Sequence, residues 1–214
     1  MQGPFGLCGI ILAAGESSRM GTDKALLPWP PPGAETPTRH TLLSAGILAL
    51  DPHTRSIVVV AGRNADSIAT VVGACGAYMV RNPDPSRGQF SSLQIGLHAA
   101  LEHGCDSAMI TPVDCPPLAQ ASLALLCESF ERARSHDLWA VAPENSGKHG
   151  HPLLIGREFI GEFIDAPATR NAREILHAHA DRIVYVSVPD DLSRAGMNTP
   201  EEYSSYADDP LPSA

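Results

Sequence analysis

The sequence predicts an α/β fold with a mostly parallel sheet, and two observations support this prediction. Short apolar or β-branched runs alternate along the chain with segments of helical character. Most of these runs are continuously apolar, which is typical of strands that helices cover on both faces. Because helical segments separate nearly all of the strands, we expect a single domain over residues 1–206 and a flexible C-terminal tail at 207–214.

The expected strands are Leu7–Leu12, Ser56–Ala61, Ala77–Val80, Ala108–Ile110, Leu138–Ala142 and Ile183–Val188. The expected helices are Thr41–Leu50, Asp66–Cys75, Ser91–Glu102, Gln120–Arg134 and Thr169–Ala178. One stretch before the tail breaks this rhythm, because Pro28–Pro37 holds five prolines in ten residues. Such a segment cannot be helical, and we expect a surface loop there.

Composition excludes several classes of protein. The chain has 214 residues, of which 43% are hydrophobic and 18% charged, so disorder is not its main state. Fifteen basic against 24 acidic residues give a net charge of −9, which argues against binding to nucleic acid or to a membrane surface. A small anionic ligand remains compatible with this charge if a few cations are focused in one cleft.

Cysteine usage and apolar runs bear on location. The five cysteines are an odd number without a C-x-x-C pair, which predicts reduced, packed thiols and a cytoplasmic protein. No apolar run approaches the roughly 20 residues that span a bilayer. The N-terminal residues carry no basic side chain before their apolar stretch, so they make a poor signal peptide.

A loop of small residues follows the first expected strand. Leu12–Lys24 (LAAGESSRMGTDK) holds two glycines, two serines and the cations Arg19 and Lys24. Ligands of open α/β sheets bind beyond the carboxyl ends of strands, and small residues let backbone N–H groups approach phosphates. The loop is neither a Walker A sequence nor G-x-G-x-x-G. Composition alone therefore leaves a phosphate site and a flexible surface turn about equally open.

A second loop, Thr111–Leu118 (TPVDCPPL), follows the expected strand Ala108–Ile110. A carboxylate such as Asp114, at the end of a strand in a proline-rich loop, suits a hard cation such as Mg²⁺. Taken alone, the loop fits an aspartate that caps a turn before Pro116 somewhat better.

Together, these loops resemble the molybdenum-cofactor nucleotidyltransferases, a family of NTP transferases. Leu12–Lys24 matches the family signature LAAGxSxRMGxxK at every fixed position. Further similar segments follow in the family's order: Gly88–Leu93 (G-x-x-S-S-L), Pro112–Leu118 (D-x-P-x-L), Gly150–Leu154 (GHPxL) and Asn198–Tyr203 (D/N-T-P-E-D/E). The resemblance covers about residues 6–206. It implies a Rossmann-like three-layer sandwich of the nucleotide-diphospho-sugar transferase type.

The opening of the signature distinguishes two branches of this family. LAAG resembles the cytidylyltransferase branch, which uses CTP, and LAGG marks the guanylyltransferase branch, which uses GTP. The chain has Ala13-Ala14-Gly15 and so resembles the first branch. This implies Mg²⁺-dependent transfer of CMP from CTP to a phosphate of molybdopterin, with release of pyrophosphate and with a molybdoenzyme as recipient of the product.

Nucleotidyl transfer requires mainly positioning and charge stabilisation from the protein. By resemblance, Arg19, Lys24 and Asp114 are the catalytic residues, with the two cations on the phosphates and Asp114 on Mg²⁺. The nucleotide-binding residues implied by the resemblance are Leu12, Ala13, Ala14, Gly15, Arg19, Lys24, Ser91, Ser92 and Asp114. No general base is expected, because the attacking phosphate is already an anion near pH 7.

Several of these residues have a plainer alternative. Ser91 and Ser92 would contact the ribose or base, but a serine that caps the helix start explains them as well. The residues implied at the acceptor are Lys148, His151, Arg170 and Arg173, and for the two arginines a solvated helix face is an equal alternative. Cys115 is expected to pack within its loop, since no step needs a nucleophile.

The closing segment departs from the family pattern. Cytidylyltransferases often read D-x-D-T-P-E-D, whereas this chain has Gly196-Met197-Asn198 before Thr199. Asn198 keeps a carbonyl oxygen for Mg²⁺, so Asp114 and Asn198 are the implied metal ligands. The loss of two carboxylates predicts weaker metal binding.

Two other functions remain open at this point. The same fold could use GTP, or transfer a nucleotide to another phosphorylated acceptor such as a sugar phosphate. A non-catalytic chaperone that binds a nucleotide or cofactor is a further alternative, for which the missing carboxylates are the only hint. The presence of Arg19, Lys24 and Asp114 favours an enzyme.

Overall fold

The structure, a computed structural model, is built on one main sheet and describes residues 6–15, 17, 20–34, 39–167, 169–190 and 196–208. The strands of the main sheet are β1 (Leu7–Ala13), β4 (Ser56–Ala61), β5 (Tyr78–Arg81), β6 (Ser107–Pro112), β7 (Ala140–Asn145), β8 (Lys148–His149), β9 (Leu153–Ile155) and β10 (Ile183–Ser187). A small second sheet pairs β2 (Pro28–Trp29) with β3 (His40–Thr41).

The α-helices are α1 (Leu42–Leu50), α2 (Ala65–Ala74), α3 (Gln89–Glu102), α4 (Gln120–Arg134), α5 (Arg157–Asp165), α6 (Ala172–Ala178) and α7 (Pro200–Ser205). Short 3₁₀ helices are η1 (Lys24–Leu26), η2 (Asp51–His53), η3 (Pro85–Arg87), η4 (Ala180–Arg182) and η5 (Tyr206–Asp208).

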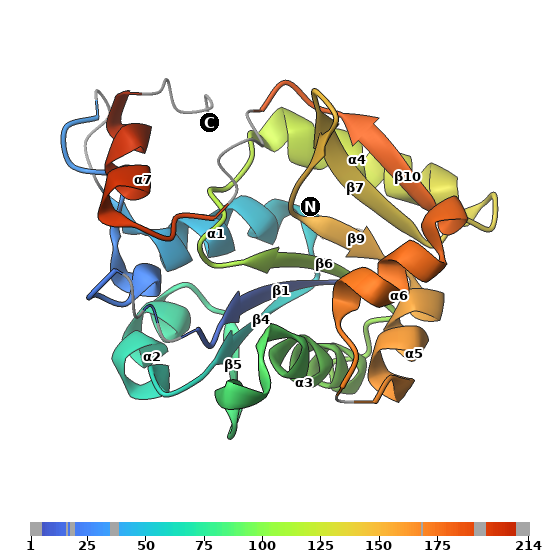
Figure 1. Cartoon of the computed structure of the whole chain (residues 1–214), viewed down its shortest axis with the longest axis horizontal. Coiled ribbons are helices and arrows are strands. Elements are labelled where there is room, and N and C mark those ends of the chain that lie inside the picture. Colours follow the sequence, from blue (N-terminus) through green and yellow to red (C-terminus); the bar gives the residue numbers. More distant parts are fainter. Residues whose placement is uncertain are drawn as a thin grey trace.

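The main sheet runs in the order β10-β7-β9-β6-β1-β4-β5, with β8 on the end of β7 (Figure 1). β1 is central and pairs in parallel with β4 and β6. β8 and β9 are antiparallel to their neighbours, and the other pairings of this sheet are parallel. The predicted α/β class with a mostly parallel sheet is therefore confirmed, and parallel neighbours bring their carboxyl ends to one edge.

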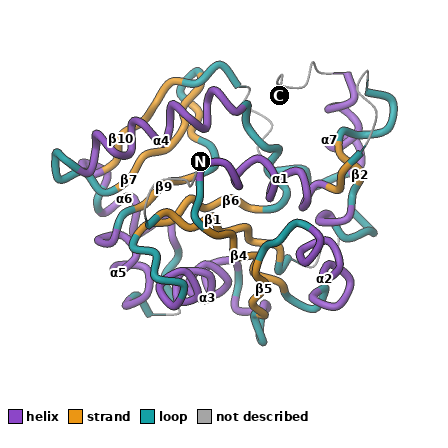
Figure 2. Tube along the Cα trace, turned by 180° about the vertical axis from the view of Figure 1, so that it is seen from behind, coloured by secondary structure: helices purple, strands orange, loops and turns teal. Residues whose placement is uncertain are grey.

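Alternate residues of the central strands enter two separate cores. Ile11 of β1 packs with α1, α2 and α4 on one face, whereas Ile10 packs with α3, α5 and α6 on the other. In Figure 2, α1 and α4 lie on the opposite side of the strands from α3 and α5. This explains why β1 is apolar at nearly every position: a strand with helices on both faces has no side for water.

The element predictions succeed where the local pattern is strong. The bounds of β4 and α4 are those expected, and the other predicted strands and helices lie within three residues of their expected bounds. The sequence did not predict the strands β2, β3, β8 and β9 or the helices α5 and α7. α5 nevertheless carries a helical signal, because Phe159, Ile160 and Phe163 share one buried face.

The proline-rich segment corrects the expectation of a surface loop over Pro28–Pro37. Trp29 is buried, and its ring lies 5.6 Å from that of Tyr206 in a small core that also contains Leu42 and Met197. The tryptophan ring drives this burial, since a large aromatic side chain gains most by leaving water. Residues 35–38, and the tail from 209 on, lie outside the described part of the chain.

The cysteines agree with the expectation of packed, reduced thiols. All five are free, and Cys8, Cys105 and Cys127 are buried. Burial raises the pKa of Cys8 to about 12, which keeps this thiol protonated and unreactive near neutral pH. Within the described residues, no helix combines the length and the hydropathy needed to span a bilayer.

Gly96 brings α3 unusually close to the sheet. A Cβ atom at this position would lie 2.8 Å from Cγ2 of Ile10 and 2.9 Å from Cγ2 of Val60. Gly73 in α2 offers a contrast, because a Cβ atom there would meet nothing within 4 Å.

We expect Gly96→Ala to lower the free energy of unfolding. Overpacking costs about 1–3 kcal/mol, which outweighs the roughly 1 kcal/mol that alanine gains over glycine in a helix. Gly73→Ala is the matched control and should stabilise by about 0.5–1 kcal/mol, since it gains propensity without a clash. Urea unfolding of both variants measures the change in the free energy of unfolding. Equal changes would show that α3 can accommodate a methyl group at position 96.

Candidate active site

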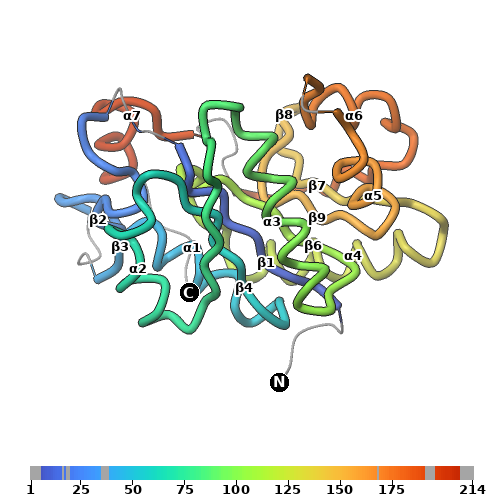
Figure 3. Tube along the Cα trace, turned by 90° about the horizontal axis from the view of Figure 1, so that it is seen from below, coloured from blue at the N-terminus to red at the C-terminus, as the bar shows by residue number. Residues whose placement is uncertain are grey.

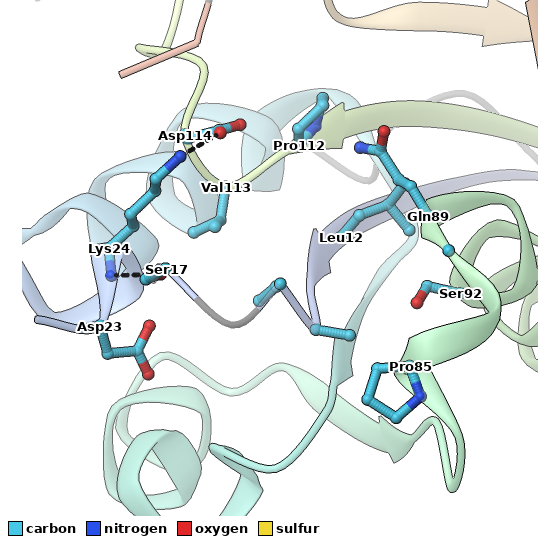
Figure 4. A pocket seen from close by; sticks show the side chains of 14 residues that line it. Leu12, Ser17, Asp23, Lys24, Pro85, Gln89, Ser92, Pro112, Val113 and Asp114 are labelled. Carbon is cyan, nitrogen blue, oxygen red and sulfur yellow. Dashed lines mark hydrogen bonds and ion pairs between the residues drawn. The ribbon is translucent and has the colours of Figure 1, made fainter. Parts of the chain in front are cut away.

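A pocket of about 230 Å³ opens at the carboxyl edge of the main sheet, where the loops after β1 and β6 meet the start of α3 (Figure 4). Its lining residues are Leu12, Ala13, Ala14, Gly15, Ser17, Asp23, Lys24, Pro85, Gly88, Gln89, Ser92, Pro112, Val113 and Asp114. In Figure 4, Lys24 and Asp114 lie at one end of the pocket, and Gln89 and Ser92 lie at the other. The pocket therefore has a charged end and a polar, neutral end.

Three residues from distant parts of the sequence meet at the charged end. The Nζ atom of Lys24 donates to Oδ2 of Asp114 at 2.8 Å and to Oδ1 of Asn198 at 2.9 Å. The Lys24 side chain is only 12% exposed, so this ion pair is shielded from water more than a surface pair is. An ammonium has three donors, and the described residues accept two from Lys24, so one remains for an oxygen in the pocket.

The two oxygen atoms that accept from Lys24, on Asp114 and Asn198, are also of the kind that binds a hard cation. The Asp114 carboxylate and the Asn198 carbonyl converge on the Nζ atom of Lys24, so the ammonium occupies this point and would have to give way to a metal ion. Such oxygens suit Mg²⁺ or a similar ion, so the residues present fit the metal that the family resemblance implies.

The closing segment reaches the pocket through backbone contacts as well. The Met197 N–H donates to the Asp114 carbonyl at 3.0 Å, and the Asn198 N–H donates to the Glu202 carboxylate at 2.6 Å. Thr199 and Glu202 form a capping box that starts α7. Gly196 has φ +100°, a backbone conformation that residues other than glycine rarely adopt. The position where the family often has a carboxylate is therefore one that favours glycine in this chain.

A second set of contacts braces the loop after β1. The side chain of Asn64, which follows β4, donates to the Ala13 carbonyl at 3.0 Å and to Oδ2 of Asp23 at 2.8 Å. Gly62 lets the backbone after β4 lie directly against the loop after β1, because a Cβ atom at position 62 would lie 2.7 Å from the Ala14 carbonyl oxygen. The turn after β4 therefore holds the loop after β1 in place.

The neutral end rests on a buried polar network. Asn82, directly after β5, donates through Nδ2 to the Oγ atoms of both Ser91 and Ser92 at 2.9 Å. Ser92 lines the pocket, whereas Ser91 does not. The expected serine cap is wrong, because α3 begins two residues earlier, at Gln89, after Gly88 with φ +91°.

The residues implied at the acceptor lie away from these contacts. Lys148, Arg170 and Arg173 are exposed, and none of them lines the pocket. Arg170 pairs with Glu174 at 3.7 Å, as a solvated helix face would. In Figure 3, β8, which holds Lys148, and α6 lie along the upper side of the molecule, toward which β1 runs. Arg19 lies outside the described residues.

Two histidines and one thiol near the site have separate environments. The rings of His149 and Tyr185 stack with centroids 3.8 Å apart, whereas Nδ1 of His151 faces the Ile110 carbonyl at 3.4 Å. The described residues contain no group of three or more metal-binding side chains of histidine, cysteine, aspartate or glutamate. Burial, and secondarily the charge of Asp114, raise the pKa of Cys115 to about 12, so this thiol is no nucleophile near pH 7.

Sequence reasoning missed five polar residues of the site, of which Ser17 lines the pocket and accepts from the Lys24 backbone N–H at 3.1 Å. Asp23 and Gln89 line the pocket, and Asn64 and Asn82 support it from behind. A second pocket of about 480 Å³ continues past Asp23 and Asn64 to Arg63 and shares Ala14, Gly15 and Ser17 with the first. For Asn64 and Asn82, the one signal in the sequence is their position, since each follows a strand at the carboxyl edge of the sheet.

A mostly parallel sheet with such a pocket at its carboxyl edge is typical of α/β proteins that bind nucleotides or similar anions. The chain matches the family described as "MobA-like NTP transferase domain" over residues 9–183. It belongs to this family and is a nucleotidyltransferase of the molybdenum-cofactor type.

Curated relatives match most of the chain. A molybdenum cofactor cytidylyltransferase of Escherichia coli is 27% identical over 197 residues, which cover 87% of this chain and 93% of that protein. A probable molybdenum cofactor guanylyltransferase of Mycobacterium avium is 30% identical over 205 residues, which cover 94% and 95%.

Solved structures share the fold. Rv0371c of Mycobacterium tuberculosis superposes with a TM-score of 0.77 at 20% identity, over 98% of this chain and all of that one. A second structure of that protein, in complex with manganese, gives 0.69 at 17% identity over 94% of this chain and 97% of that one. These likenesses support the three-layer architecture.

The His151 ring ties the stability of this region to pH. Burial lowers the pKa of His151, an effect that the Ile110 carbonyl and the Asp114 charge only partly oppose. The unfolded histidine titrates near 6.5, so below about that pH the unfolded state binds the proton more readily and stability is lost.

We therefore expect His151→Gln to flatten the decline of unfolding free energy between pH 6.5 and 5. The slope should fall by up to about 1.4 kcal/mol per pH unit, the amount that one proton contributes. Urea unfolding at several pH values measures both slopes, and parallel curves for the variant and the wild type would contradict a lowered pKa of His151.

Proposed function

We propose that the chain transfers CMP from CTP to a phosphate of molybdopterin and releases pyrophosphate, with Mg²⁺ bound at Asp114 and Asn198. The two-ended pocket carries this proposal: an ammonium and converging oxygens lie at one end, and Ser92 and Gln89 lie at the other (Figure 4). A nucleoside triphosphate has the same polarity, with its anionic chain at one end and its neutral base at the other.

In this proposal, the base lies between Ser92 and the loop Leu12–Gly15, and the triphosphate runs on along this loop toward Lys24. Leu12, Ala13 and Ala14 are buried and form the floor. Lys24 offsets charge on the leaving pyrophosphate, in a chain whose net charge is −9 and which has few cations to replace it. Arg19 is proposed to assist from the same loop.

The metal site follows from the same contacts. Asp114 supplies a charged oxygen and Asn198 a neutral one, and Mg²⁺ would replace the ammonium of Lys24 between them, which frees Lys24 for the phosphates. A bound Mg²⁺ would neutralise phosphate charge and orient the reacting groups. The residues themselves need move no proton, since the attacking phosphate is already an anion. The same donor set accommodates manganese, the ion in the related Rv0371c complex.

Lys148, His151, Arg170 and Arg173 remain our proposal for the acceptor side. They are not part of the pocket, so they would act on a second molecule that approaches from the side of β8 and α6. A molybdoenzyme would then receive the product. Guanylyl transfer is the second candidate, because a probable guanylyltransferase is among the curated relatives.

Pyrophosphate release tests the reaction. With Mg²⁺ and molybdopterin, CTP should give pyrophosphate faster than GTP, and sugar phosphates should not replace molybdopterin. Release with a sugar phosphate alone would assign another acceptor. Binding of CTP without any turnover would favour the chaperone alternative.

Nucleotide choice should depend on Ala14, which lines the pocket. We expect Ala14→Gly to narrow the gap between the CTP and GTP dissociation constants, because glycine opens space and adds backbone freedom beside the base. Calorimetric titration of both nucleotides measures the gap. If the wild type binds the two equally, cytidylyl specificity is wrong.

The metal site can be tested by charge at two positions. Asp114→Ala should abolish turnover, because it removes the charged ligand, whereas the two main cores, which do not include this side chain, should keep their fold. Asn198→Asp should lower the Mg²⁺ concentration for half-maximal rate, because a second carboxylate attracts the ion more strongly. Asn198→Ala should raise it.

A Mg²⁺ titration of turnover compares the wild type with these variants, and circular dichroism checks the fold of each. If both Asn198 variants keep the wild-type half-maximal concentration, Asn198 is no ligand and its bond to Lys24 is structural.

A further inference from the structure

The amide of Asn82 lies directly behind the neutral end of the pocket. It is 3% exposed and does not line the pocket itself. Its Oδ1 atom accepts from the backbone N–H of Asp84 at 3.0 Å, and its Nδ2 atom donates to Ser91 and Ser92. Both serines are buried, with 5% and 3% exposure, so water does not substitute for these bonds.

The orientation of this amide is determined by its partners. A backbone N–H can only donate, so the atom that faces Asp84 must be the carbonyl oxygen. The NH₂ group must then face the two serines, and each of its hydrogens reaches one Oγ atom. A flipped amide would leave buried groups unpaired, at a cost of about 1–3 kcal/mol each.

The two serines differ in the use of their own hydrogens. Ser91 Oγ donates to the Gly88 carbonyl at 2.8 Å, so its hydrogen is committed to the backbone. Ser92 Oγ accepts from Asn82, and none of the described residues accepts a hydrogen from it. Because Ser92 lines the pocket, its hydroxyl presents a donor there.

We propose that Asn82 is a positioning residue for nucleotide selection, which fixes Ser92 as a hydrogen-bond donor to the base. This inference rests on the proposed function, since it places a base beside Ser92. Cytosine has two adjacent acceptors, O2 and N3, on its pairing edge. Guanine carries N–H donors at the corresponding N1 and N2 atoms and keeps only O6 as an acceptor. A fixed donor therefore favours cytosine.

Asn82→Asp tests the inference, because it replaces the NH₂ group with an acceptor oxygen of nearly the same size. Both serines should then turn their hydrogens to the carboxylate, and Ser92 should show only lone pairs to the pocket. We expect the ratio of the GTP to the CTP dissociation constant to fall about tenfold, the scale of one hydrogen bond. Calorimetry on the full chain with Mg²⁺ measures both constants.

Two serine variants show whether the effect passes through Ser92. Ser92→Ala should lower the ratio by itself, and adding Asn82→Asp to it should change the ratio no further. Ser91→Ala is the matched control, because Ser91 shares the amide but not the pocket, and its ratio should equal that of the wild type. If the buried carboxylate of Asn82→Asp prevents folding, Asn82→Leu releases the hydroxyl and should shift the ratio in the same direction.

An unchanged ratio in a folded Asn82 variant would overturn the inference. An equal loss of affinity for CTP and GTP would also overturn it, because Ser92 would then contact the ribose. So would a double variant whose ratio of dissociation constants shifts by the full amount again. A wild type that prefers GTP would instead count against the proposed nucleotide. The role of Asn82 would still stand if its variant moved the ratio through Ser92.

Discussion

One ammonium group connects three parts of the chain that are far apart in sequence. Lys24 bonds to Asp114, 90 residues away, and to Asn198, 174 residues away. The closing segment lies beside the charged end of the pocket because Asn198 bonds to Lys24 and the Met197 N–H bonds to Asp114. Its burial in the small core with Trp29 and Leu42 then orders the region around α7. The site and this part of the fold therefore share their main interaction.

The remainder of the site is built from supports rather than reactive groups. Asn64 holds the loop after β1, and Asn82 holds the start of α3, each from the end of a strand. Neither side chain needs to touch a ligand to matter. This suits a reaction in which geometry and charge dominate, since small displacements of a bound phosphate cost rate steeply.

The sequence predicts the scaffold well because the strands and helices have strong periodic patterns. The first-strand loop and Asp114 could be predicted because parallel strands end at one edge. Asn64 and Asn82 could not, since an asparagine after a strand looks like any turn residue and its partners lie in other segments. Trp29 was misjudged for a similar reason: five prolines dominated the local pattern, whereas burial was decided by distant Met197 and Tyr206.

The backbone at Gly196 has a consequence for how this chain could diverge further. A side chain at φ +100° would be strained, and its Cβ atom would lie 3.2 Å from Nδ2 of Asn198. An acidic residue at 198 needs no backbone change, so it is one mutational step away, whereas an acidic residue at 196 would first require the turn to be rebuilt. A carboxylate is therefore much easier to introduce at position 198 of this chain than at position 196.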